Sequence, residues 1–312
     1  MRAITNRRRY VREGIVLEVI LDALKDTAIV FPFILIIYML IELLENGTTA
    51  AKSRRALQGP VAPLIGGATG LIPQCGFSVM AAKLYDKGLI RTGTIMAVFL
   101  ATSDEALIIL LVNSPMSAHA AQAILPLIMV KLLIAVAVGY LVNAIIPDRR
   151  SDVSPLYTEG GEAAAYSCGH EHEGKSAASL YFLEPLLHTL KVTAYILLVN
   201  LILGFIIAEV GEDKIAAGLI GGKYFQPFIT AAVGLIPNCA SSTVITETFV
   251  KGSISFGSCI AGLCTNAGLG LVVLLKNTKK IKRNILFMLS LYAISVLAGI
   301  IINVICAAAG IM

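Results

Sequence analysis

Long apolar runs, repeated along almost the whole chain, constrain its fold more than any other feature. Each run is long enough to cross the hydrocarbon core of a bilayer, which takes about 20 residues of helix. Only 14% of the 312 residues are charged and the mean hydropathy is +0.82, so lipid is the expected solvent. The sequence predicts an all-α integral membrane protein with eight to ten transmembrane helices. The eight clear runs lie roughly at 28–45, 60–82, 93–113, 120–146, 180–208, 226–250, 253–275 and 284–311.

Two nearly identical segments at an offset of 164 residues indicate an internal repeat. Gly70-Leu-Ile-Pro-Gln-Cys-Gly-Phe-Ser78 is matched by Gly234-Leu-Ile-Pro-Asn-Cys-Ala-Ser-Ser242. Lys87, Gly88 and Gly93 match Lys251, Gly252 and Gly257 at the same offset. Gly139 and Asn143 then match Gly299 and Asn303 at an offset of 160. We therefore expect two homologous halves, 1–146 and 179–312, joined by an aqueous linker at 147–178. Such duplication is typical of secondary transporters, and an odd number of spans per half would make the repeats inverted.

A proline lies at the centre of each repeated segment and predicts a broken helix. Pro73 and Pro237 each remove a backbone donor and crowd the preceding turn. In lipid a break is tolerated where its carbonyls and amides line a cavity, and the half-helix ends then supply partial charges to a ligand. The alternative is a pair of kinked helices that pack through small residues. The substrate-binding residues predicted at the breaks are Gln74, Cys75, Ser78, Asn238, Cys239 and Ser242.

A polar segment interrupts the apolar run that precedes each half's last span. Thr102, Ser103, Asp104 and Glu105 lie in the first half, and burying each carboxylate there costs about 2.5 to 3.5 kcal/mol on insertion scales. We interpret these residues as a cation or proton site, whereas the alternative is a loop where both carboxylates reach water. The equivalent stretch of the second half has no carboxylate and offers Asn266.

Further candidates lie at the start of each half and in the linker. Two trios at i, i+4 and i+7 share a helical face and are candidates for ion coupling or gating, although an interfacial helix explains them equally well. His170 and His172, beside Cys168, are weak candidates for metal capture in the linker. The two trios are Glu18, Asp22 and Lys25, and Glu184, His188 and Lys191.

The sequence argues against several other functions. It has no zinc-protease, nucleophile-elbow or phosphate-loop motif, so we expect neither an enzyme nor a cofactor. The net charge of +5 suits anionic lipid headgroups rather than nucleic acid. An eight-span arrangement places 83–91 and 276–283 on opposite sides. The two sides then carry 12 and 10 basic residues in total, so orientation stays open. A homo-oligomer is compatible with these features.

The repeated segments, together with Ser103-Asp-Glu-Ala106 and Ala261-Gly-Leu-Cys-Thr-Asn-Ala-Gly-Leu-Gly270, closely resemble those of the ten-transmembrane heavy-metal exporters. The resemblance spans nearly the full chain. Members of that family are also labelled arsenic efflux proteins or manganese transporters. The resemblance implies export of a metal or metalloid ion across the cytoplasmic membrane of a prokaryote by a multi-pass protein.

We therefore predict a metal or metalloid exporter that works by alternating access, coupled to protons or another ion. Asp104, Glu105, Gln74 and Asn238 carry hard oxygen donors suited to Mn²⁺, whereas Cys75 and Cys239 suit arsenite or a soft metal. The metal ligands predicted are therefore these thiols and carboxylates. The first alternative is a carrier for a small anion gripped by half-helix N-termini, and an intramembrane enzyme acting on a lipid is the second. A passive channel is the third alternative. It is disfavoured because a continuous pore needs no pair of broken helices.

Overall fold

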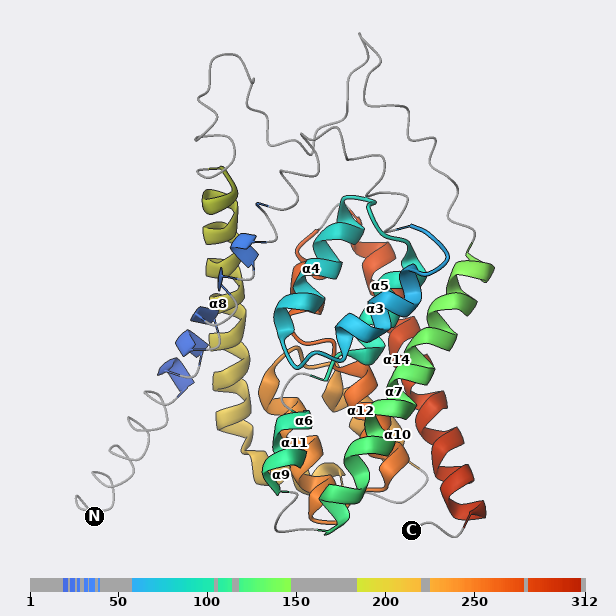
Figure 1. Cartoon of the computed structure of the whole chain (residues 1–312). Coiled ribbons are helices and arrows are strands. Elements are labelled where there is room, and N and C mark those ends of the chain that lie inside the picture. The colour runs from blue at the N-terminus through green and yellow to red at the C-terminus, as the bar shows by residue number, and fades with distance from the viewer. Residues whose placement is uncertain are drawn as a thin grey trace, which may run out of the picture.

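The computed structural model describes residues 58–103, 106–113, 118–146, 184–219, 225–277 and 280–309, with scattered positions between 19 and 39. Every regular element in these residues is helical, and no strand occurs among them (Figure 1). The helices of the first half are α3 (Ala62–Gly70), α4 (Cys75–Asp86), α5 (Thr92–Ala101), α6 (Ala106–Asn113) and α7 (Ala118–Ile145). Those of the second half are α8 (Glu184–Val210), α9 (Glu212–Leu219), α10 (Gln226–Gly234), α11 (Cys239–Val250), α12 (Phe256–Thr265), α13 (Leu269–Leu275) and α14 (Ile281–Ala308).

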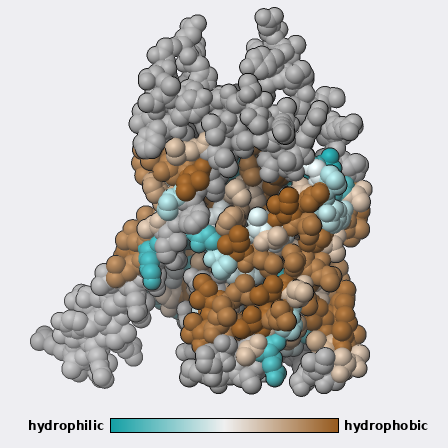
Figure 2. Space-filling model, in the orientation of Figure 1, coloured by the Kyte–Doolittle hydropathy of each residue, from teal (hydrophilic) through white to brown (hydrophobic). Residues whose placement is uncertain are grey.

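Four described stretches are long and apolar enough to cross a membrane: Thr92–Asn113, Ala121–Ile145, Thr189–Glu209 and Ile281–Ala308. A fifth is the pair α12 and α13, bent by 40° at its break. Their outward side chains are apolar, as at Leu133, Leu286 and Val304, and hydrophobic residues cover much of the described surface in Figure 2. The prediction of an all-α integral membrane protein is confirmed, and the total of eight to ten spans stays a prediction because it includes residues outside the described ranges.

The first proline-containing segment breaks as predicted but does not cross the membrane. Pro73 lies between the end of α3 and the start of α4. The Gln58 Nε2 donates to Gly88 O at 2.9 Å, which joins the residues just before α3 and just after α4. At 1.5 Å per residue, the two helices are about 14 and 18 Å long, against a core of about 30 Å. The segment is therefore a hairpin that enters and leaves at one face.

The second proline-containing segment forms the same kind of hairpin. Gln226, at the start of α10, donates from Nε2 to Ser253 O at 3.2 Å and accepts from Ser255 N at 3.0 Å. Both contacts lie just beyond the end of α11. The prediction that 60–82 and 226–250 cross the bilayer is therefore wrong. A proline shows where a helix breaks, but the return of the chain is set by tertiary contacts that local sequence does not reveal.

The two hairpins open at opposite faces of the molecule. Arg283, at the start of α14, lies 3.4 Å from Asp86 at the mouth of the first hairpin. Asn303, twenty residues further along the same helix, accepts from Gly257 N at 3.0 Å near the mouth of the second. Twenty helical residues span about 30 Å. We call these faces the Asp86 face and the Ser253 face.

Corresponding helices of the two halves run in opposite directions. α7 brings Asn143, near its C-terminus, to Gly93 N at 2.9 Å on the Asp86 face. The matching pair Asn303 and Gly257 lies on the Ser253 face. Figure 1 shows α7 ending, and α14 beginning, at the same end of the molecule. This geometry supports the predicted duplication, in inverted form, whereas the boundary segment 147–178 lies outside the described residues.

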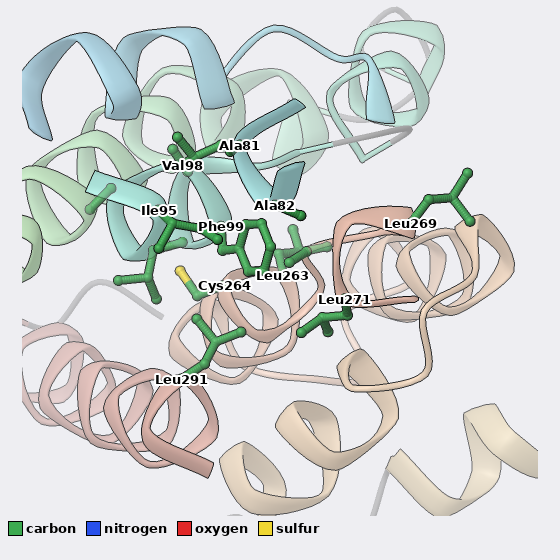
Figure 3. Packing of buried hydrophobic residues seen from close by; sticks show 14 of the residues in the cluster. Ala81, Ala82, Ile95, Val98, Phe99, Leu263, Cys264, Leu269, Leu271 and Leu291 are labelled. Carbon is green, nitrogen blue, oxygen red and sulfur yellow. The ribbon is translucent and has the colours of Figure 1, made fainter. Parts of the chain in front are cut away.

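The core forms where each half reaches into the other. α4 packs against α13, and a Cβ added at Gly270 would meet the backbone and side chain of Ser78. α6 packs in turn against α11. Figure 3 shows Phe99 of α5 among apolar side chains of α4, α12, α13 and α14. The halves therefore share one continuous apolar core.

Candidate functional site

The breaks in both hairpins lie next to the ends of α5 and α12. Gly70, at the end of α3, is packed so tightly that a Cβ would meet the carbonyl of Val98 and the methyl of Ala101 in the last turn of α5. Gly234, at the end of α10, is packed in the same way against Gly262 of α12. The lack of a side chain at each glycine lets the hairpin pack closely against α5 or α12.

At each tip an amide residue precedes the first residue of the returning helix, which is a cysteine. Asn238 caps α11 by accepting from Ala240 N at 3.0 Å through Oδ1. Gln74 holds the same position on α4 but makes no such cap, and its buried Nε2 has no hydrogen-bond partner. Cys75 and Cys239 are half-buried, and neither forms a disulfide. The tips thus present two thiols and an amide whose nitrogen is not engaged.

The predicted serines and Asn266 are buried beside the tips. Ser78 Oγ donates to Cys75 O, and Ser242 Oγ donates to Cys239 O, both at 2.8 Å. The Asn266 Nδ2 donates to Ser241 Oγ at 3.1 Å, while its Oδ1 accepts from Gly268 N at 2.9 Å. Asn266 therefore ties the break after α12 to the first turn of α11. Gly268 has a φ of +54°, which favours glycine at this break.

α5 ends at Ala101, and the polar residues Thr102 and Ser103 follow it outside the helix. Thr102 and Ser103 are buried, and their hydroxyls donate to Val98 O at 2.8 Å and Ala101 O at 3.1 Å. Asp104 and Glu105 lie outside the described residues, so their role as ligands stays a prediction. In the described part of the chain, no three His, Cys, Asp or Glu side chains form a metal-binding group.

Most coupling and linker candidates lie wholly or in their side chains outside the described residues, so their roles stay predictions. Lys25 and Lys191 are exposed. The side chains of Glu184 and His188 lie outside the described residues. So do Glu18, Asp22, His170 and His172 in full.

The sequence analysis missed one buried charge, Lys131. It lies in the middle of α7, is 0% exposed, and donates from Nζ to Thr102 O at 2.5 Å and to Leu263 O at 2.9 Å. A signal was present, because Lys131 is the only charged residue in the apolar run 120–146. A charge inside a membrane segment marks a functional site by default.

The Asp86 face carries a cluster of basic side chains. Asp86 accepts from Asn277 and lies against Arg283, whose guanidinium is 4.5 Å from the ring centroid of Tyr85. Burial raises the pKa of Asp86, although Lys83, Arg283 and Lys280 lower it. Burial lowers the pKa of Lys276, and the neighbouring Lys83 and Lys191 lower it further. This face therefore concentrates positive charge.

The centre of the molecule has two kinds of helix end. The N-termini of α4 and α11 carry positive partial charge and favour thiolates or other anions, whereas the C-termini of α5 and α12 carry negative partial charge and favour cations. The ammonium of Lys131 already lies at the C-termini of α5 and α12. Helix ends of both signs near the core are suited to ion binding.

Comparison with known proteins gives one match. The model of a family described as "Putative, 10TM heavy-metal exporter" matches residues 12–181 and 188–311. Among curated proteins and among solved structures, no match was found.

Proposed function

Because the chain belongs to this family of 10TM heavy-metal exporters, we propose that it exports a thiophilic metal or metalloid, of the arsenite type, by alternating access of its two halves. Membership supports metal efflux by a multi-pass membrane protein. We further propose the substrate class, the mechanism and a location in a prokaryotic cytoplasmic membrane.

One observation carries the choice of substrate. In both halves a cysteine is the first residue of a half-helix that starts inside the membrane, Cys75 on α4 and Cys239 on α11. A helix N-terminus favours a negatively charged sulfur, and thiolates select soft ions. The amide of Gln74, with its unengaged nitrogen, is suited to an oxygen on a metalloid hydroxide. Manganese would instead depend on Asp104 and Glu105.

The distribution of basic residues supports an orientation of the protein in the membrane. On helices α4 to α14 the Asp86 face carries most of them, and the Ser253 face carries Lys214 and Lys251. Cytoplasmic ends of membrane proteins are enriched in Lys and Arg. The Asp86 face is therefore the cytoplasmic one in this proposal. The predicted arrangement with 83–91 and 276–283 on opposite sides is wrong, because Asp86 and Arg283 are in contact. The basic side chains of the Asp86 face are Lys83, Lys87, Arg91, Lys191, Lys276, Lys280, Lys282 and Arg283.

The test is metal accumulation in cells that lack their own exporters. Cells expressing the wild-type chain are loaded with arsenite, methylarsenite, zinc or manganese and compared with Cys75→Ser/Cys239→Ser and Asp104→Asn/Glu105→Gln. Cys306→Ser, a thiol on α14 away from both tips, is the matched control. Lowered arsenic that needs both tip thiols and survives the control supports the proposal. Lowered manganese that needs only the carboxylates would replace it, and no change for any species would remove metal efflux.

A further inference from the structure

Lys131 is buried where a charge needs compensation. Its ammonium is fully enclosed, and placing a lysine at the centre of a membrane helix costs about 2.5 to 3.5 kcal/mol on insertion scales. The two carbonyl oxygens at 2.5 and 2.9 Å provide part of that compensation. One oxygen comes from each half of the chain, so the ammonium bridges the halves at the core.

Both carbonyls belong to interrupted helices. Thr102 is the C-cap of α5, and Leu263 lies in the last turn of α12. The N–H of Ala267, which would meet Leu263 O if α12 continued, donates to Thr265 O instead. Carbonyls released by a break, at the negative end of a half-helix, are the groups with which secondary transporters coordinate a coupling cation.

The second half has no counterpart to this charge. Asn143 and Asn303 correspond at an offset of 160, which places Leu291 opposite Lys131. Leu291 is 0% exposed and packs among apolar side chains (Figure 3). The two halves are otherwise alike in their helix breaks and glycine contacts, so the lysine is an addition to one half and not a requirement of the shared fold.

We propose that Thr102 O and Leu263 O form a cation site at the junction of the two halves, and that Lys131 fills this site with its own ammonium in place of a dissolved coupling cation. The role of this site in transport rests on the proposed function, whereas the site itself rests on the two hydrogen bonds of Lys131. It follows that transport by the wild-type protein needs no free monovalent cation at this position, and that removal of the ammonium leaves a vacant cation site.

The experiment removes the ammonium and offers small cations. Purified Lys131→Ala protein is heated in sodium, ammonium, methylammonium or choline chloride at equal ionic strength, and the same salts are used in metal-efflux assays with vesicles. We expect sodium or methylammonium to raise the unfolding temperature of Lys131→Ala relative to choline, because a ligand that binds the folded state stabilises it. Efflux by this variant should be lost in choline and recover partly with the same cations.

Leu291→Ala is the matched control, because it opens a similar space at the equivalent position without removing a charge. Its unfolding temperature should not distinguish sodium from choline, and neither should that of the wild type. Lys131→Met keeps the volume, so it should fold and fail to transport in every salt. The inference is overturned if Lys131→Met exports at the wild-type rate, or if no small cation stabilises Lys131→Ala more than Leu291→Ala. Failure of wild-type efflux for every metal would remove the proposed function and leave the thermal result standing.

Discussion

The Asp86 carboxylate on α4 lies 3.4 Å from the Arg283 guanidinium on α14, and so connects the two halves of the chain at the Asp86 face. Asp86 is 14% exposed, and Lys280 Nζ also donates to its backbone carbonyl at 3.3 Å. In the proposed alternating-access mechanism, movement of the two halves would separate these groups. In the proposed orientation, the pair lies on the cytoplasmic side, where it would help to set closure of that side.

The raised pKa of Asp86 predicts a pH effect on stability. Burial raises the folded-state pKa above the ordinary 3.8, so the folded protein binds this proton more tightly than the unfolded chain. The contribution of this group to the free energy of unfolding should rise as the pH falls through the folded pKa towards 3.8, and be lost as the pH rises. Thermal unfolding should be measured in detergent at about pH 7 and about pH 4. The unfolding temperature of the wild type relative to that of Asp86→Asn should be higher at the lower pH. Glu247→Gln, at an exposed ion pair, is the control; an unchanged difference between wild type and Asp86→Asn would contradict the prediction.

The matched asparagines predict equal effects in the two halves. Asn143→Ala leaves Gly93 N without its acceptor, and Asn303→Ala does the same to Gly257 N. Each substitution should cost about 1 to 3 kcal/mol, the penalty of an unpaired buried donor. Asn113→Ala, which removes only a bond to the carbonyl of Ile109 in its own helix, should cost less. Denaturation of the three variants checks this, and a large difference between the first two would argue against equivalent halves.

The close approach of helices predicts intolerance at Gly234. A methyl group there would meet the Gly262 carbonyl, so Gly234→Ala should shift α10 from α12 and destabilise the protein by about 1 to 3 kcal/mol or more. Gly218→Ala on α9 meets nothing within 4 Å and should be neutral or slightly stabilising. Yield and unfolding temperature measure both, and a well-folded Gly234→Ala protein would show that the tip is not closely packed.

The assigned orientation predicts which residues are accessible from outside the cell. Lys87 and Lys251 are both exposed, on the Asp86 face and the Ser253 face respectively. A membrane-impermeant maleimide added to intact cells should label Lys251→Cys, and should label Lys87→Cys only after permeabilisation. The parent chain gives the background from its own thiols. The opposite pattern would reverse the orientation.

Local features of the sequence predicted the breaks but not the path of the chain. Pro73 and Pro237 lie within the breaks, because the loss of a backbone donor acts on the residues next to it. The return of each hairpin depends instead on Gln58 and Gly88, or Gln226 and Ser253, which are separated by 30 and 27 positions. Hydropathy describes apolar length and cannot distinguish a span from a hairpin buried in protein.

The candidate site was predicted in the same partial way. The tip residues Gln74 and Asn238 do lie at the breaks, but the contact of Asn266 with Ser241 joins residues 25 positions apart. Lys131 was recognisable as a lone charge in an apolar run, whereas its position between Thr102 and Leu263 depends on packing between the halves. Contacts between residues of the two halves cannot be predicted from the composition of either segment alone.

The hairpins also constrain how the protein is made. α3 and α4 are each too short to insert into the bilayer as a transmembrane span. The helices against which α3 packs, α5 and α7, are synthesised later. The first hairpin can therefore dock only after α5 and α7 have been inserted. The second can dock only after α12 and α14. A nascent chain that stops after α4 therefore lacks the helices against which its hairpin packs.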